Sequence, residues 1–145
     1  MTIHRDIVGA VVADRGLSTA RFMESVIKAA KIDATDTRKA VSPALIPDAY
    51  KIDRASRTVD AYEVEVTSPV TEDKLDRFAA LAWELDGEEW DLRLFIVNRF
   101  GHVSPPVDLL AVWHGLSRRR DRDGRGPRVA ARADRLDRVR REPLR

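Results

Sequence analysis

The stretch that decides the fold is IPDAYKIDRASRTVDAYEVEV, residues 46–66. Two runs rich in β-branched and aromatic residues, 47–53 and 58–67, lie on either side of the polar segment RASR. Such runs around a short polar turn predict a β-hairpin. Side chains alternate along a strand, so Glu63 and Glu65 in the second run are expected to share one face. Because like charges on one face repel each other, the hairpin raises the question of what offsets this repulsion.

Helices are predicted on both sides of the hairpin. Apolar residues at helical spacing predict helices over 2–14 and 19–31. Thr71 is a good N-cap and is followed by two acids, which predicts a helix over 71–86. The segment 32–45 is expected to be mostly loop because prolines interrupt any long helix there.

The strongest predicted strand follows in WDLRLFIVNRFG and is apolar on both faces from 92 to 97. Such a strand is typical of the centre of a sheet that helices cover. The helix before it makes a crossover, so this strand should lie parallel to 58–67. A last helix is predicted to start at Ser104 and run through VDLLAVWHGL. These elements predict an α/β fold, with a small mixed β-sheet flanked by helices.

Charge divides the chain into two parts. Residues 1–116 hold 14 Lys and Arg against 19 Asp and Glu, a net charge of −5, whereas residues 117–145 hold 12 Arg against 5 acids, a net charge of +7. This asymmetry predicts a compact domain over 1–116 and an Arg-rich basic tail over 117–145, partly helical or disordered.

The tail has three interpretations. Its arginines can contact nucleic-acid phosphates without regard to sequence, in a salt-sensitive way. They can instead pair locally with the tail's own acids in a solvated segment, or bind an acidic protein surface such as a second copy of the acidic domain. The candidates for nucleic-acid binding are Arg118, Arg119, Arg120, Arg122, Arg125 and Arg128.

Several classes of protein are excluded by what the sequence lacks. It has no cysteine, which excludes disulfides, thiolate metal sites and a cysteine nucleophile. It has no run of 18 uncharged apolar residues, so no transmembrane helix and no membrane partner are expected. The first residues lack the features of a secretory signal, and a cytoplasmic protein is therefore expected.

A third acid, Asp48, begins the first strand of the hairpin. Pairing of the two strands is expected to bring Asp48 near Glu63 and Glu65. Such a cluster raises a carboxyl pKa and costs stability unless something compensates the charge. Mg²⁺ compensates it with one or two carboxylates plus waters, and leaves positions open for a phosphate. The alternative is an ordinary amphipathic strand whose acids face water.

The order Pro47–Asp48, hairpin, Glu63–Val64–Glu65 resembles the motif of the PD-(D/E)XK nuclease superfamily. The resemblance covers roughly residues 19–100 and includes the helix and the apolar strand after the motif. It implies a restriction-endonuclease-like core and hydrolysis of DNA phosphodiester bonds with Mg²⁺ or Mn²⁺. A clear first strand before the motif is missing.

The resemblance also implies residue roles. Asp48 and Glu63 would be metal ligands, and Glu65, at the position where the family has its lysine, would orient the water or hold a second metal. Lys74 in the following helix would supply the lysine and stabilise the transition state, although a solvated helix residue is the alternative. Glu24 is the only acid of helix 19–31, from which some family members supply a further ligand.

Two functions from different classes follow. The first is a metal-dependent nuclease acting on DNA, with Asp48, Glu63, Glu65 and Lys74 as catalytic residues and a homodimer as a possible state. The second is a non-catalytic nucleic-acid-binding protein, or a phage assembly or structural protein, on the same scaffold. Metal dependence separates the two.

Overall fold

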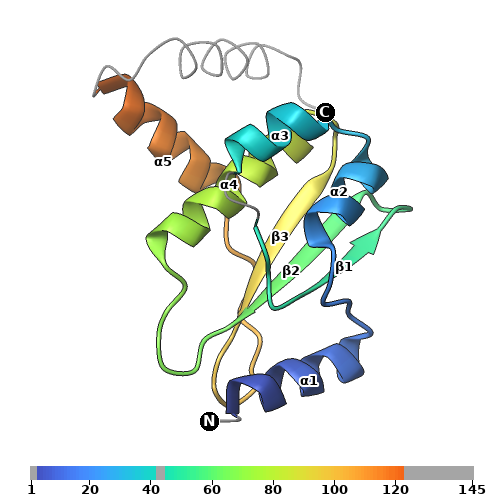
Figure 1. Cartoon of the computed structure of the whole chain (residues 1–145). Helices are drawn as coiled ribbons and strands as arrows, with labels where there is room; N and C mark the ends of the chain where they lie inside the picture. Colours follow the sequence, from blue (N-terminus) through green and yellow to red (C-terminus); the bar gives the residue numbers. More distant parts are fainter. Residues whose placement is uncertain (1–2, 42–44, 123–145) are drawn as a thin grey trace.

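The predicted hairpin forms two of the three strands of a small mixed sheet flanked by helices (Figure 1). The computed structural model describes residues 3–41 and 45–122. Their elements, in order, are α1 (Ile3–Arg15), α2 (Phe22–Ala30), α3 (Ala34–Ala40), β1 (Ala49–Asp53), β2 (Thr58–Val64), α4 (Glu72–Asp86), β3 (Asp91–Val97) and α5 (Leu109–Arg122).

The strand pairing is as the sequence predicts. β1 runs antiparallel to β2, with Ala49 opposite Tyr62, and β2 runs parallel to β3, with Glu63 opposite Ile96. The expectation that β3 is central is wrong, because the strand order is β1-β2-β3. β3 nevertheless buries Leu92 and Leu94 on one face and Val97 on the other, while Asp91 and Arg93 are exposed.

The outer edge of β3 is covered by the segment that follows it. Val103 and Val107 form antiparallel bridges with Val97 and Leu94. The predicted helix start at Ser104 is therefore wrong, because these residues are extended along the sheet edge. α5 begins at Leu109. The side chain of Asp108, just before it, accepts a hydrogen bond from the Ala111 N–H at 3.1 Å.

A further difference lies in the segment 32–45, which was expected to be mostly loop. Part of it forms α3, whose N-cap Asp33 accepts a hydrogen bond from the Asp36 N–H at 2.8 Å. The helix ends before the prolines, so the proline argument limits its length without preventing it.

Two apolar clusters form on opposite faces of the sheet. The larger one joins α2, α4 and α5 to the sheet face that carries Tyr50, Val59 and Leu94. The smaller one joins α1 to the other face, where the last residues of β2 and β3, Val64 and Val97, are buried. The end of the sheet where both strands finish therefore lies between α1 and the other helices (Figure 1).

The start of the basic tail belongs to α5. This helix runs through Arg122 and so continues past residue 116. Of the six candidate arginines for nucleic-acid binding, Arg125 and Arg128 lie outside the described residues. Within residues 3–41 and 45–122, none of the helices has the length and apolar character that crossing a membrane requires.

Candidate functional site: paired carboxylates at the end of the sheet

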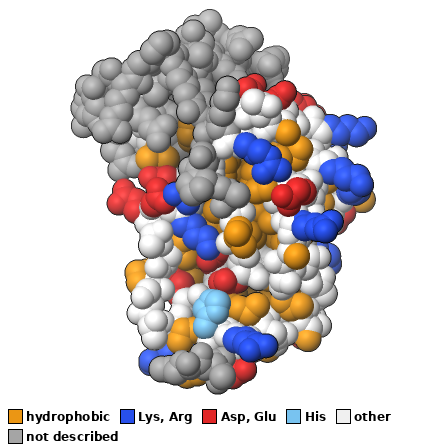
Figure 2. All heavy atoms as spheres, in the orientation of Figure 1, with side chains coloured by type: hydrophobic (Ala, Val, Ile, Leu, Met, Phe, Trp, Pro, Cys, Tyr) orange, Lys and Arg blue, Asp and Glu red, His pale blue; other side chains and the backbone are white. Residues whose placement is uncertain are grey.

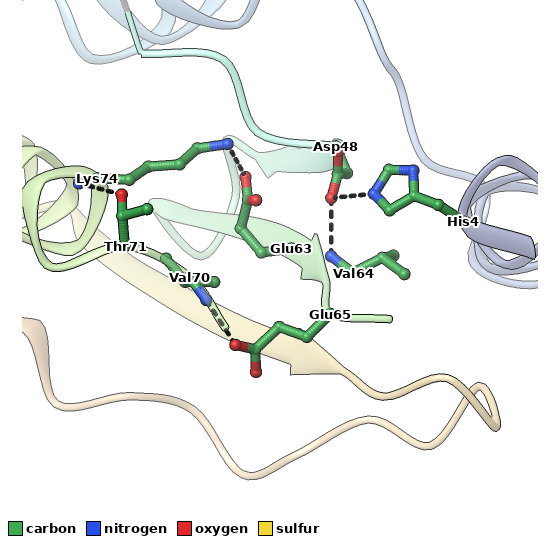
Figure 3. Close-up of polar contacts among 8 residues, drawn as sticks. All are labelled: His4, Asp48, Glu63, Val64, Glu65, Val70, Thr71 and Lys74. Atoms are coloured by element: carbon green, nitrogen blue, oxygen red, sulfur yellow. Dashed lines mark hydrogen bonds and ion pairs between the residues drawn. The ribbon is translucent and has the colours of Figure 1, made fainter. Parts of the chain in front are cut away.

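The candidate site lies where β2 ends, because the sequence places carboxylates on both strands of the hairpin there. The β1–β2 register ends at Ala49 opposite Tyr62, and continuing it by one residue sets Asp48, just before β1, across from Glu63 on the same face. Figure 3 shows the two carboxylates side by side, with Lys74 reaching Glu63 from α4 and His4 reaching Asp48 from α1. The consecutive hairpin and α4 thus meet the distant α1 in one polar row.

Asp48 is held by contacts on one oxygen. Its Oδ2 accepts a hydrogen bond from the Val64 N–H at 2.7 Å. The Nε2 atom of His4 lies 3.3 Å from the same oxygen, and it donates when it carries the proton. The Asp48 side chain is 21% exposed, so it remains accessible to a ligand.

Glu63 is the buried member of the row. Its side chain is only 7% exposed, and Lys74 Nζ lies 2.8 Å from its Oε1. Lys74 reaches it because Thr71 caps α4 by accepting a hydrogen bond from the Lys74 N–H at 3.2 Å. Lys74 also lies one turn before Phe78 on the helix stripe that packs on the sheet.

The surroundings of Glu63 favour its protonated form. Burial raises the pKa of Glu63, and the nearby Asp48 carboxylate raises it further. Lys74 and a hydrogen bond from the Asp48 backbone oppose this rise, but the pKa stays above its ordinary value. Burial is thus the main cause of the rise, and the contact with Lys74 offsets it only in part.

Glu65 does not join this row. β2 ends at Val64, and the Glu65 side chain turns toward the segment that leads to α4 (Figure 3). There its Oε2 accepts a hydrogen bond from the Val70 N–H. The alternation expected from a strand reaching residue 67 fails because the strand stops three residues earlier. The structure thus brings together two of the three predicted carboxylates, with Lys74.

The two carboxylates that remain, Asp48 and Glu63, suit one hard metal cation better than two. Within the described part of the chain, no group of three or more Asp, Glu or His side chains is placed to hold a metal ion. Mg²⁺ does not need three, because it binds through one or two carboxylates and keeps several waters. Asp48 and Glu63 supply such a pair, and a cation beside them would favour the ionised form of Glu63.

The remaining predicted residues lie elsewhere. Glu24 is on the exposed side of α2, where Arg38 approaches it at 3.8 Å. Arg118 is exposed on α5. Arg119, Arg120 and Arg122 also belong to that helix, but their side chains lie outside the described residues.

His4 is the site residue that sequence reasoning missed. It precedes Ile7, Val8 and Val11 at spacings of three, four and seven, so it continues the apolar stripe of α1. That stripe packs on the sheet, which brings His4 to Asp48. The spacing was a usable signal, but the docking position of α1 was not readable from the sequence.

Comparisons of this chain with protein-family models, with curated proteins and with solved structures found no match.

Proposed function

We propose that the protein is a metal-dependent nuclease that hydrolyses DNA phosphodiester bonds at the Asp48–Glu63 pair, on a restriction-endonuclease-like core. The observation that carries the proposal is the meeting of two carboxylates from adjacent strands with a lysine from the crossover helix. The pair carries more negative charge than Lys74 balances, and this is the condition in which a divalent cation is stabilising.

Each residue has a role that follows from its place. Asp48 and Glu63 would hold the cation. A bound Mg²⁺ or Mn²⁺ lowers the pKa of a coordinated water and neutralises charge on the phosphate. Lys74 has an ammonium group 2.8 Å from Glu63 and is 30% exposed, so it can donate to a phosphate oxygen that approaches the pair. His4 would hold the Asp48 carboxylate in position.

The roles of Glu65 and the tail need separate statements. Glu65 would support the site by fixing the segment 65–70 through Val70, and in that position it is a positioning residue. The tail arginines would add sequence-independent affinity for phosphates. Assembly into a homodimer remains part of the proposal, because two strands must be cut to break a duplex.

Metal binding and cleavage together test the proposal. Calorimetric titration with Mn²⁺ should show binding in the wild type and its loss in Glu63→Gln, while Asp60→Asn, a matched change on the same strand outside the site, should bind as the wild type does. Plasmid DNA should be cut by the wild type and by Asp60→Asn, but not by Glu63→Gln. Equal Mn²⁺ binding by Glu63→Gln would contradict the metal assignment. DNA binding without any metal-dependent cleavage would favour the non-catalytic binding or assembly function.

A further inference from the structure

A groove of about 510 Å³ lies along the outer edge of β1, away from the paired carboxylates. It is lined by basic side chains from three different elements: Lys28 of α2, Lys51 of β1 and Arg54 of the hairpin turn. All three are exposed. Figure 2 shows several Lys and Arg side chains on the right of this face, over α2 and the hairpin as Figure 1 places them, with acidic side chains among them.

The backbone explains why this edge is open. Ser18 closes one position of the β1 edge, with hydrogen bonds of 2.8 Å to the Tyr50 carbonyl and 2.9 Å from the Tyr50 N–H. Alternation along the strand turns the N–H and carbonyl of Ile52 toward the same edge. Ser18 and Ser25 add hydroxyl groups to the lining. The groove thus combines positive charge with hydrogen-bond donors, which is the chemistry that phosphate oxygens accept.

Acids lie beside the groove but do not line it. Among the described residues that line the groove there is no carboxylate. Asp53 lies between Ile52 and Arg54 in the sequence, but its Oδ1 accepts hydrogen bonds from the Ala55 and Ser56 N–H groups at 3.0 and 3.3 Å. That carboxylate keeps its charge and interacts with Lys51, and Asp60 of β2 lies opposite Lys51, so these two acids offset part of the positive charge at one side of the groove.

The spacing along β1 connects the groove to the candidate site. Lys51 follows Asp48 by three residues and Arg54, in the turn just after β1, by six, which corresponds to about 10 Å and at most about 20 Å along an extended chain. At about 3.4 Å per base pair, this is roughly three to six steps of duplex DNA. A straight strand edge with cations at these distances suits a regular backbone that leads away from the site.

We propose that this groove docks the phosphodiester backbone of duplex DNA on one side of the Asp48–Glu63 pair. The inference rests on the proposed function for the choice of DNA, but the groove is separate from the hydrolytic residues. Lys28, Lys51 and Arg54 would each contact a phosphate, and they would act on binding rather than on the chemical step.

The test measures binding of a fluorescein-labelled 20-base-pair duplex by anisotropy, with the full chain and EDTA present so that no cleavage occurs. The triple variant Lys28→Gln/Lys51→Gln/Arg54→Gln is compared with Arg5→Gln/Arg38→Gln/Arg99→Gln, which removes the same charge from positions that do not line the groove. The groove variant should bind at least about tenfold more weakly, and its salt dependence should lose about one unit of slope per contact removed. The control should keep most of the affinity and of the slope.

Four results would overturn or separate the proposals. If both triple variants lose the same affinity and slope, the groove is not a docking surface. If the groove variant loses more affinity for labelled poly-glutamate than it loses for the duplex, the groove binds an acidic protein instead. If the groove variant loses duplex binding while the wild type never cleaves DNA with Mn²⁺, the groove proposal stands and the nuclease proposal fails. If the groove variant binds the duplex as the wild type does and cleaves it, the nuclease proposal stands and the groove proposal fails.

Discussion

Two ion pairs involving β2, in its middle and at its end, show how similar residues can have different consequences. In the middle, Asp60 of β2 faces Arg93 of β3, and the guanidinium donates two hydrogen bonds at 2.7 and 2.9 Å. At the end, Glu63 has one contact of 2.8 Å with Lys74 and a second carboxylate, Asp48, beside it.

The two pairs differ in solvation and in charge balance. Arg93 is 43% exposed and its pKa is raised, first by the hydrogen bonds from its guanidinium to Asp60. Glu63 is 7% exposed and its pKa is raised by burial. The first pair joins one acid to one base through two hydrogen bonds and has the features of a structural contact. The second is buried and has excess negative charge, so it is the one where a further cation is stabilising.

Replacing the basic residue of each ion pair should distinguish the two pairs most clearly in their effect on catalysis. Lys74→Met should lower DNA cleavage by about 10² to 10³-fold, because it removes a donor aimed at the charge that develops on the phosphate. Arg93→Met should leave the rate of cleavage unchanged, since its pair lies in the middle of the sheet. Single-turnover plasmid cleavage with Mn²⁺ measures both. Equal rates for wild type and Lys74→Met would remove Lys74 from the mechanism.

The same two variants should also differ in stability, by a smaller factor. In EDTA, Lys74→Met should lower the free energy of unfolding by about 1–3 kcal/mol, because it leaves a buried carboxylate without its partner. Arg93→Met should cost at most about 1 kcal/mol, since an exposed pair contributes little.

Urea denaturation checks this difference. Adding Mn²⁺ should restore part of the loss in Lys74→Met, because the cation then pairs with the free carboxylates, and should not change Arg93→Met relative to the wild type. A similar cost for both variants would show that burial of Glu63 does not distinguish the two regions.

The raised pKa of Glu63 predicts an unusual dependence of stability on pH. Between the unfolded value, about 4.3, and the higher folded value, the folded state binds more protons than the unfolded state. The contribution of Glu63 is therefore fully present below the unfolded value and is lost as pH rises through the folded pKa. In EDTA, Glu63→Gln should remove this decline from the stability profile.

Asp53 provides the opposite control within the same hairpin. Hydrogen bonds from Ser56 are the main reason that the pKa of Asp53 lies below its ordinary value. Its contribution is present above the unfolded value, about 3.9, and is lost as pH falls through the folded pKa. Asp53→Asn should therefore alter only the acidic end of the profile. Urea denaturation at several pH values measures both, and a profile unchanged by Glu63→Gln would contradict the raised pKa.

The comparison also shows what the sequence could predict. Strand alternation and the hairpin pattern place Asp48 opposite Glu63, and the position of Lys74 before the Phe78 stripe predicts its reach. These features are local in the sequence, or depend on the pairing of one pair of strands. The covering of the β3 edge by Val103 and Val107, and the contact of His4 with Asp48, depend on where separate segments dock, which periodicity does not specify.

The smallest expected effect is that of Glu65→Gln, at a residue that differs from Glu63 although only Val64 separates them. Its Oε2 accepts the Val70 N–H, and an amide oxygen can accept the same hydrogen bond. Glu65→Gln should therefore keep cleavage within about twofold and lower the free energy of unfolding by less than about 1 kcal/mol, because only the charge of the acceptor is lost.

Glu65→Ala tests the role of Glu65 more strongly than Glu65→Gln does. It removes the acceptor and should cost about 1–3 kcal/mol of unfolding free energy, while the rate at saturating Mn²⁺ changes little. If Glu65 were instead a metal ligand, as the resemblance to the nuclease motif implies, both variants would lose Mn²⁺ affinity and cleavage together. Calorimetry and plasmid cleavage on the two variants thus decide whether β2 contributes one carboxylate to the site or two, because only a ligand loses metal affinity when its hydrogen bond to Val70 is preserved.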